Sequence, residues 1–115
     1  MSLPLKTPDC PLYALLRRGE VAEFNRRRAE GESCDLAGAD LSRLDLRGLE
    51  ARGLDLRDAY FRQADVRGVD FRAAQLDGAS FAEAHVSGCY FPDSVSAAEL
   101  MLALAHGTRL RCREP

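Results

Sequence analysis

Acidic residues and arginines recur along the chain with a period of five. They are the most regularly spaced residues whose side chains could do chemistry. An acid often stands two positions before an arginine, as Asp45 does before Arg47 and Asp65 before Arg67. Such neighbours could recognise a charged partner. They could also form surface ion pairs, each of which contributes only about 0–1 kcal/mol to stability. The residue types alone leave both interpretations open.

No set of side chains has the composition and spacing of a catalytic or metal site. His85 and His106 have no evident partner, and the sequence contains none of the common nucleotide-binding or metalloprotease motifs. The 4 cysteines include no CxxC pair, so we do not expect a zinc site. The sequence therefore predicts a non-enzymatic protein without a cofactor or metal.

The cysteines are expected to be reduced thiols. The N-terminal stretch MSLPLKTPDCP lacks the apolar segment of a signal peptide, and no segment approaches the roughly 18 apolar residues of a membrane span. A cytoplasmic location is therefore expected, where disulfides are rare. Cys34 and Cys89 are then predicted to be small core residues, whereas Cys10 and Cys112 fall in the flanking segments.

An apolar period of five must position the charged residues. From Leu36 onward, every fifth residue is apolar, and so is every residue two positions before it. The fifth-position residues, here called centres, are Leu36, Leu41, Leu46, Ala51, Leu56, Phe61, Val66, Phe71, Leu76, Phe81, Val86 and Phe91. A helix cannot use this period, because five residues advance about 140° beyond a full turn. In an extended segment, however, residues i−2 and i point to the same side.

Each pentapeptide is therefore predicted to be a short strand followed by a corner. The corner takes the two positions after a centre, and glycine, which tolerates positive φ, often occupies the second. These glycines are Gly38, Gly48, Gly53, Gly68, Gly78 and Gly88. Repeated turning of one hand would wind the chain into a solenoid with the apolar residues inside and the acids outside.

The segments ADLSR, LDLRG, LDLRD, ADVRG and VDFRA resemble the pentapeptide repeat family, whose pattern is A(D/N)LXX. The resemblance extends over residues 34–93. It implies an all-β solenoid, a right-handed quadrilateral β-helix with four pentapeptides per coil and coils at 34–53, 54–73 and 74–93. Residues 20 apart are then expected to stack at about 4.8 Å.

Helical caps are predicted at both ends, because repeat proteins must cover their apolar cross-sections. Residues 9–31 should contain two short helices broken at Gly19. Residues 94–107 should contain a third helix, with Ser96 and Glu99 at capping-box spacing and Gly107 as its stop. With the tail, 108–115, these segments make a single domain, 1–115.

The C-terminal helix is apolar on nearly all sides. One face can cover the last coil near Phe91, and the other needs a partner or the folded-back tail. The resemblance favours a partner, because other pentapeptide repeat proteins commonly dimerise through C-terminal elements. We therefore expect a homodimer that uses Leu100, Met101 and Leu104, with a self-covered monomer as the alternative.

A flat charged face of the solenoid is a second candidate for partner binding, since arginine and tyrosine are favoured interface anchors. The candidate residues are Arg47, Arg67, Arg52, Arg72, Asp45, Asp65, Glu50, Asp70, Tyr60 and Tyr90. The expected partner is a protein, of unknown identity. Direct binding to nucleic acid or to a membrane is not expected.

The resemblance also offers an alternative function. Some dimeric pentapeptide repeat proteins resemble B-form DNA, bind DNA gyrase or topoisomerase IV, and protect against quinolones or gyrase poisons. Phosphate mimicry needs acids without neutralising arginines beside them, and this chain interleaves the two. We therefore expect a protein-interaction or scaffold module, with the gyrase-binding DNA mimic as the alternative.

Overall fold

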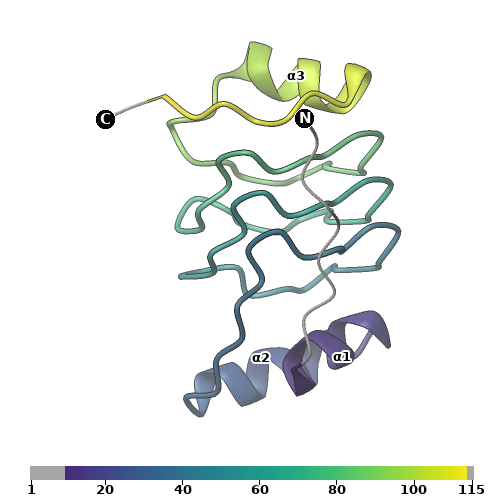
Figure 1. The fold of residues 1–115 in the computed structure, drawn as a ribbon, viewed down its shortest axis with the longest axis vertical. Helices are drawn as coiled ribbons and strands as arrows, with labels where there is room; N and C mark the ends of the chain where they lie inside the picture. Colours follow the sequence, from purple (N-terminus) through teal and green to yellow (C-terminus); the bar gives the residue numbers. More distant parts are fainter. Residues whose placement is uncertain (1–9, 114–115) are drawn as a thin grey trace.

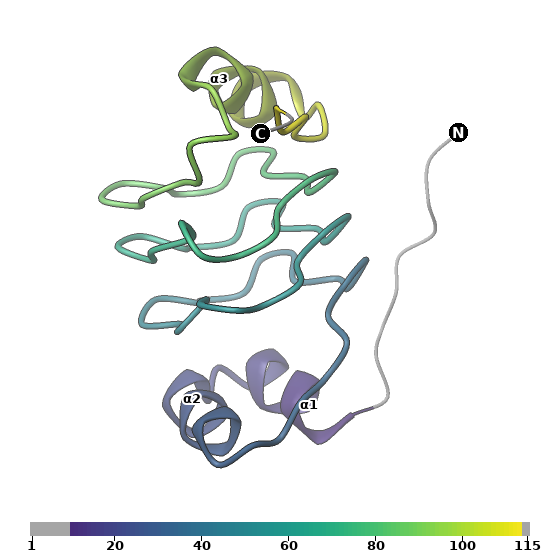
Figure 2. The ribbon, with the colours of Figure 1, turned by 90° about the vertical axis from the view of Figure 1, so that its left-hand side faces the viewer.

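The computed structural model describes residues 10–113 of the chain. The N-terminal stretch 1–9, including the predicted cap start at Asp9, and the last two tail residues, 114–115, lie outside the described part. The described residues form three helices, α1 (Pro11–Arg17), α2 (Val21–Ala29) and α3 (Ala97–His106). Figures 1 and 2 show α1 and α2 at one end of a stack of coils and α3 at the other.

Parallel bridges between residues 20 apart hold the coils together. They join Asp40 to Tyr60, Asp45 to Asp65 and Asp70 to Tyr90, among others. Each bridge is isolated, and the described residues form no longer strand or sheet. The chain reaches the next corner before a second consecutive pair can form, so the predicted short strands are single bridges in the structure.

At most corners, the second residue has the expected positive φ. Four of these positions carry Arg43, Asp58, Gln63 and Glu83 in place of glycine, with φ between 58° and 63°. A non-glycine residue in this region costs about 1–2 kcal/mol, so the stacked coils must hold these corners in place. Ala73 occupies an equivalent position but does not have a positive φ, and neither does Asp93 at the last corner. The corner at Ala73 therefore differs from the other corners that lie between two pentapeptides.

Phenylalanine rings fill the inside of the later coils. The rings of Phe61 and Phe81 stack with centroids 4.6 Å apart, and Phe71 meets both of them edge-on. The inward positions two residues before Phe61 and Phe81 are Ala59 and Ala79, and both alanines are completely buried. Small residues beside large ones allow the close packing that protein interiors require.

The N-terminal helices cover the first coil. Leu12, Leu16 and Phe24 are buried in the common core. Tyr13 donates its hydroxyl proton to the carbonyl of Asp40 at 2.7 Å, and Asn25 of α2 donates to the carbonyl of Gly48 at 2.9 Å. Both N-terminal helices therefore combine apolar burial with hydrogen bonds to the coil backbone.

A disulfide bond joins Cys10 to Cys34, with their Cα atoms 6.4 Å apart. The prediction that all four cysteines are reduced thiols is therefore wrong for this pair. Their separation of 24 residues gave no signal, because the two become neighbours only when α1 packs against the start of the coils. Cys89 and Cys112 are free.

The tail adds a segment to one side of the third coil. Arg109 forms an antiparallel bridge with Ser80. Leu110 donates its N–H to the carbonyl of Ala79 at 2.8 Å and accepts from the N–H of Gly78 at 2.7 Å. The Leu110 side chain is buried with 1% exposure, so it closes part of the core that the last coil leaves open.

The described helices are short. None of them is long and apolar enough to cross a membrane.

Candidate binding surfaces

Most acid–arginine neighbours on the coils form ion pairs within their own pentapeptide. Arg67 donates from Nε and Nη2 to the two carboxylate oxygens of Asp65, at 2.9 and 2.7 Å. The same Asp65 accepts the backbone N–H of Arg67 at 3.2 Å, and Arg72 binds Asp70 in the same way. The pairs Asp45 with Arg47 and Asp55 with Arg57 share this geometry.

These contacts keep the carboxylates charged. Hydrogen bonds from Arg67 lower the pKa of Asp65 to about 2, although partial desolvation opposes the shift. Hydrogen bonds from Arg72 likewise lower the pKa of Asp70 to about 2. Each aspartate is thus an anion whose charge a fixed guanidinium largely neutralises.

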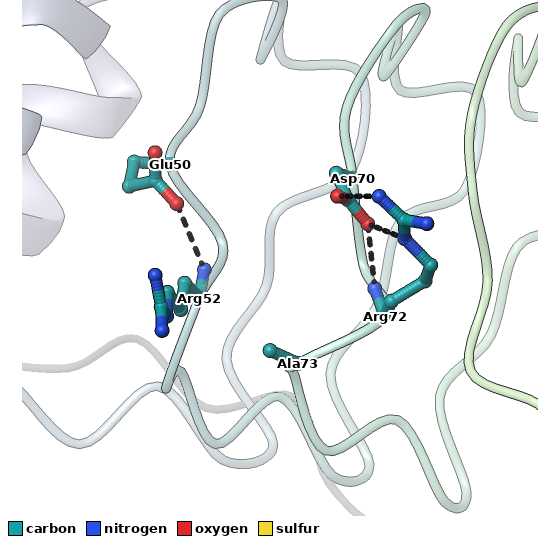
Figure 3. Close-up of a pocket in the computed structure, with 5 residues that line it drawn as sticks. All are labelled: Glu50, Arg52, Asp70, Arg72 and Ala73. Atoms are coloured by element: carbon teal, nitrogen blue, oxygen red, sulfur yellow. Dashed lines mark hydrogen bonds and ion pairs between the residues drawn. The ribbon is translucent and has the colours of Figure 1, made fainter.

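Glu50 and Arg52 depart from this arrangement. The Glu50 carboxylate accepts the backbone N–H of Arg52 at 3.4 Å, but no ion pair joins their side chains, and none is found for Arg52 with any other acid of residues 10–113. Figure 3 shows the contrast between this pair and the two-pronged contact of Arg72 with Asp70. Glutamate is one methylene longer than aspartate, so it does not place its oxygens where Asp70 does.

A groove lies between these two pairs. It has a volume of about 340 Å³ and is lined by Glu50, Arg52, Asp70, Arg72 and Ala73. A second depression of about 180 Å³ is lined by Asn25, Arg28, Ala29, Glu50 and Arg52. Because both include Glu50 and Arg52, they form one surface that runs from α2 across the coils, named here the Arg52 groove.

The two predicted tyrosine anchors have different environments. Tyr60 accepts a hydrogen bond from Arg109 at 2.7 Å and lies beneath its guanidinium, so it holds the tail. Tyr90 is 58% exposed, with the Arg72 guanidinium 4.6 Å from its ring centroid. Tyr90 therefore remains accessible near the groove, whereas Tyr60 is committed to an internal contact.

Helix α3 keeps an exposed apolar face. Met101 is 70% exposed and Leu102 is 40% exposed, whereas Ala103 is buried. Leu100 and Leu104, two of the predicted contact residues, are only partly exposed. The tail pairs with the third coil and leaves Met101 uncovered. Leu102 was not among the predicted contact residues, because helical periodicity alone did not show which face of α3 turns toward the coils.

Beside α3, part of the third coil is also uncovered. Val86, Cys89 and Phe91 are only partly buried. One coil below, the N–H of Val66 donates to the carbonyl of His85, and the N–H of Phe71 donates to the carbonyl of Tyr90. The N–H groups of Val86 and Phe91 have no such acceptor within residues 10–113. This edge therefore combines apolar side chains with unpaired backbone groups.

Groups that could support other chemistry are sparse. In the described part of the chain, no cluster of three histidine, cysteine or acidic side chains could hold a metal ion. Burial raises the pKa of the Cys89 and Cys112 thiols, which lowers the fraction of reactive thiolate.

Comparison with known proteins gives one match. A family model described as pentapeptide repeats, with 8 copies, matches residues 32–62 and 55–91. Searches of curated proteins and of solved structures found no match.

Proposed function

The chain belongs to the pentapeptide repeat family, and from this premise we propose that it is a non-enzymatic module that binds another protein. The stacked coils would form the right-handed quadrilateral β-helix typical of that family, with the helices as caps. A rigid stack of this kind presents fixed surfaces and has little freedom to close around a substrate. The cytoplasmic location remains part of the proposal. In that reducing compartment the Cys10–Cys34 bond would be exposed to reduction.

The uncovered C-terminal end carries the proposal. Met101 and Leu102 project from α3, and Phe91 and Val86 lie partly exposed beside an unpaired coil edge. Apolar surface and unpaired backbone groups together favour association, because burial removes the first from water and pairing satisfies the second. We propose that a second copy of the chain covers this end.

A second copy suits the surface for a geometric reason. The edge offers donors at Val86 and Phe91 and acceptors at Ala84 and Cys89, whose equivalents one coil below are paired with this coil. An edge with both donors and acceptors can pair with an identical edge around a two-fold axis. The result would be a homodimer joined end to end through its C-terminal elements.

Light scattering tests the dimer directly, with twice the monomer mass expected. Met101→Glu places a charge in the interface and should give the monomer mass, whereas Gln75→Glu, which adds the same charge at an exposed coil position, should leave the dimer intact. Leu104→Glu should also dissociate it but is a poorer test, because Leu104 packs partly against the core. A monomeric wild type, or a Met101→Glu variant of unchanged mass, would rule out this interface.

The gyrase-binding DNA mimic is the less favoured alternative. Asp45, Asp55, Asp65 and Asp70 each have an arginine bonded to their carboxylate. Neutralised acids are poor substitutes for the phosphates of DNA. Inhibition of supercoiling by purified gyrase at micromolar concentrations of this protein would revive the alternative.

A further inference from the structure

The Arg52 groove lies where the regular stacking of corners is interrupted. Gly38, Asp58 and Gly68 each donate their corner N–H to a carbonyl 19 positions later, whereas Gly53 donates to Ala73, 20 positions later, at 2.9 Å. Ala73 also lacks the positive φ of the equivalent corner residues. The corner that follows Arg72 is thus displaced by one residue along the chain, and Ala73 lines the groove.

The groove also contains the arginine that lacks the usual aspartate. Arg47, Arg57, Arg67 and Arg72 are each bonded to an aspartate two positions earlier. Glu50 replaces that aspartate before Arg52, and the only hydrogen bond of its carboxylate among residues 10–113 is with the backbone N–H of Arg52. The Arg52 guanidinium therefore keeps its donors available to a ligand in the groove.

A second arginine at the same surface, Arg28, is held by backbone carbonyls and by the ring of Phe24. Arg28 donates from its two terminal nitrogens to the carbonyls of Glu50 and Arg52, at 2.9 and 3.0 Å. Its position is fixed by these bonds, yet no carboxylate of residues 10–113 neutralises it. The continuous surface thus holds three arginines, Arg28, Arg52 and Arg72, against two acids, Glu50 and Asp70.

From this arrangement we infer that the Arg52 groove binds a carboxylate-bearing segment of a partner protein. The excess positive charge is one unit, which suits a short acidic peptide with one or two carboxylates in the groove. Arg52 would donate two parallel hydrogen bonds to a carboxylate, the geometry that carboxylates prefer. Arg28 would add a second positive charge nearby. The exposed ring of Tyr90, against Arg72, would flank the peptide backbone.

The acids of the same surface argue against nucleic acid as the ligand. A phosphate backbone is a continuous polyanion, and proteins bind it with extended positive patches. Glu50 and Asp70 interrupt the positive charge here, and the chain has a net charge of −2. A single carboxylate can approach Arg52 without meeting both acids at once.

The inference rests on the proposed protein-binding function and names a ligand class for one face. It can be tested by titrating 15N-labelled protein with hexaglutamate and following the arginine Nε–H signals by NMR. Saturable shifts of Arg52 and Arg28 are expected, with weaker binding at higher salt. Hexaglutamine should cause no shift. The absence of any saturable shift with millimolar hexaglutamate would overturn the inference.

Matched variants separate a specific groove from general charge attraction. Arg52→Gln should weaken hexaglutamate binding by about tenfold, because one charge-assisted contact is lost. Arg57→Gln makes the same change in net charge, but it removes a guanidinium that is already paired. Its dissociation constant for hexaglutamate should stay within about twofold of the wild-type value. Glu50→Gln removes the competing acid and should tighten binding. Equal weakening by Arg52→Gln and Arg57→Gln would contradict a specific site.

Two further ligands test the class of partner. Inorganic phosphate and single-stranded oligothymidylate should each bind more weakly than hexaglutamate at the same charge concentration. Tighter binding of either would overturn the assignment to an acidic peptide. Met101→Glu, which tests the dimer, changes a residue of α3 that does not line the groove, and it should leave hexaglutamate binding unchanged. The failure of one proposal is therefore distinguishable from the failure of the other.

Discussion

Removal of the Cys10–Cys34 bond should loosen the N-terminal cap. The bond ties the start of α1 to the first residues of the repeat region. In the double variant Cys10→Ser/Cys34→Ser, α1 would still be held by buried Leu12 and Leu16 and by the Tyr13 hydrogen bond to the coil. The variant should therefore fold, but with lower stability.

The magnitude follows from the length of chain that the bond closes. For a separation of 24 residues, the chain-entropy relation gives a loss of about 3.5 kcal/mol of unfolding free energy at 25 °C. For a domain of this size, that corresponds to a fall in Tm of about 10–20 °C. Because α1 lies at the end of the stack, part of the effect could instead emerge as earlier unfolding of the cap alone.

Urea unfolding followed by circular dichroism measures the effect, with mass spectrometry to verify that the starting protein is oxidised. A phosphine reductant should lower the stability of wild type to that of the double variant and leave the double variant unchanged. Cys112→Ser removes a free thiol and should respond to the reductant as wild type does. The reasoning is refuted if verified oxidised wild type and the double variant unfold at the same urea concentration.

Two other predictions concern the tail and the ion pairs. Leu110→Ala should lower the unfolding free energy by about 2–4 kcal/mol, because Leu110 is completely packed; Leu102→Ala, at an exposed position, should cost much less in the same urea experiment. The stability that Asp65 and Asp70 contribute should be complete above about pH 5 and fall as the pH drops toward 2, because their folded pKa values of about 2 lie below the ordinary 3.8. A depressed carboxyl pKa stabilises the fold above the unfolded value and loses that contribution on protonation. Urea midpoints that do not change between pH 4 and pH 2 would contradict this assignment.

The family and the register of the repeats could be predicted from the sequence because the signal is local and repeated. Centres such as Leu41, Phe61 and Phe81 stand at a fixed period, and the bridge from Asp40 to Tyr60 has the offset of 20 that four pentapeptides require. The sequence also indicated that an acid and the arginine two positions later could form an ion pair, since residues i−1 and i+1 point to the same side of one pentapeptide.

The candidate groove was only partly predictable. Its charged residues were candidates from the sequence. The period of five, however, places Glu50 and Arg52 at positions equivalent to those of Asp70 and Arg72. Their difference arises from one methylene and from the displaced corner at Ala73. A glutamate at a position otherwise held mostly by aspartate was the available signal. The contribution of Arg28 was missed, because it comes from a helix about 24 residues earlier in the chain.

By itself the sequence determined the inside of this protein, since a strict period of five places apolar residues on one side of every short extended segment. Only the tertiary structure decided what happens at the ends and across the outer surface. The Cys10–Cys34 bond, the entry of Leu110 into the core and the exposure of Met101 all depend on how segments distant in the chain dock. Periodicity constrains neighbours along the chain, whereas docking depends on which surfaces remain uncovered once the coils have stacked.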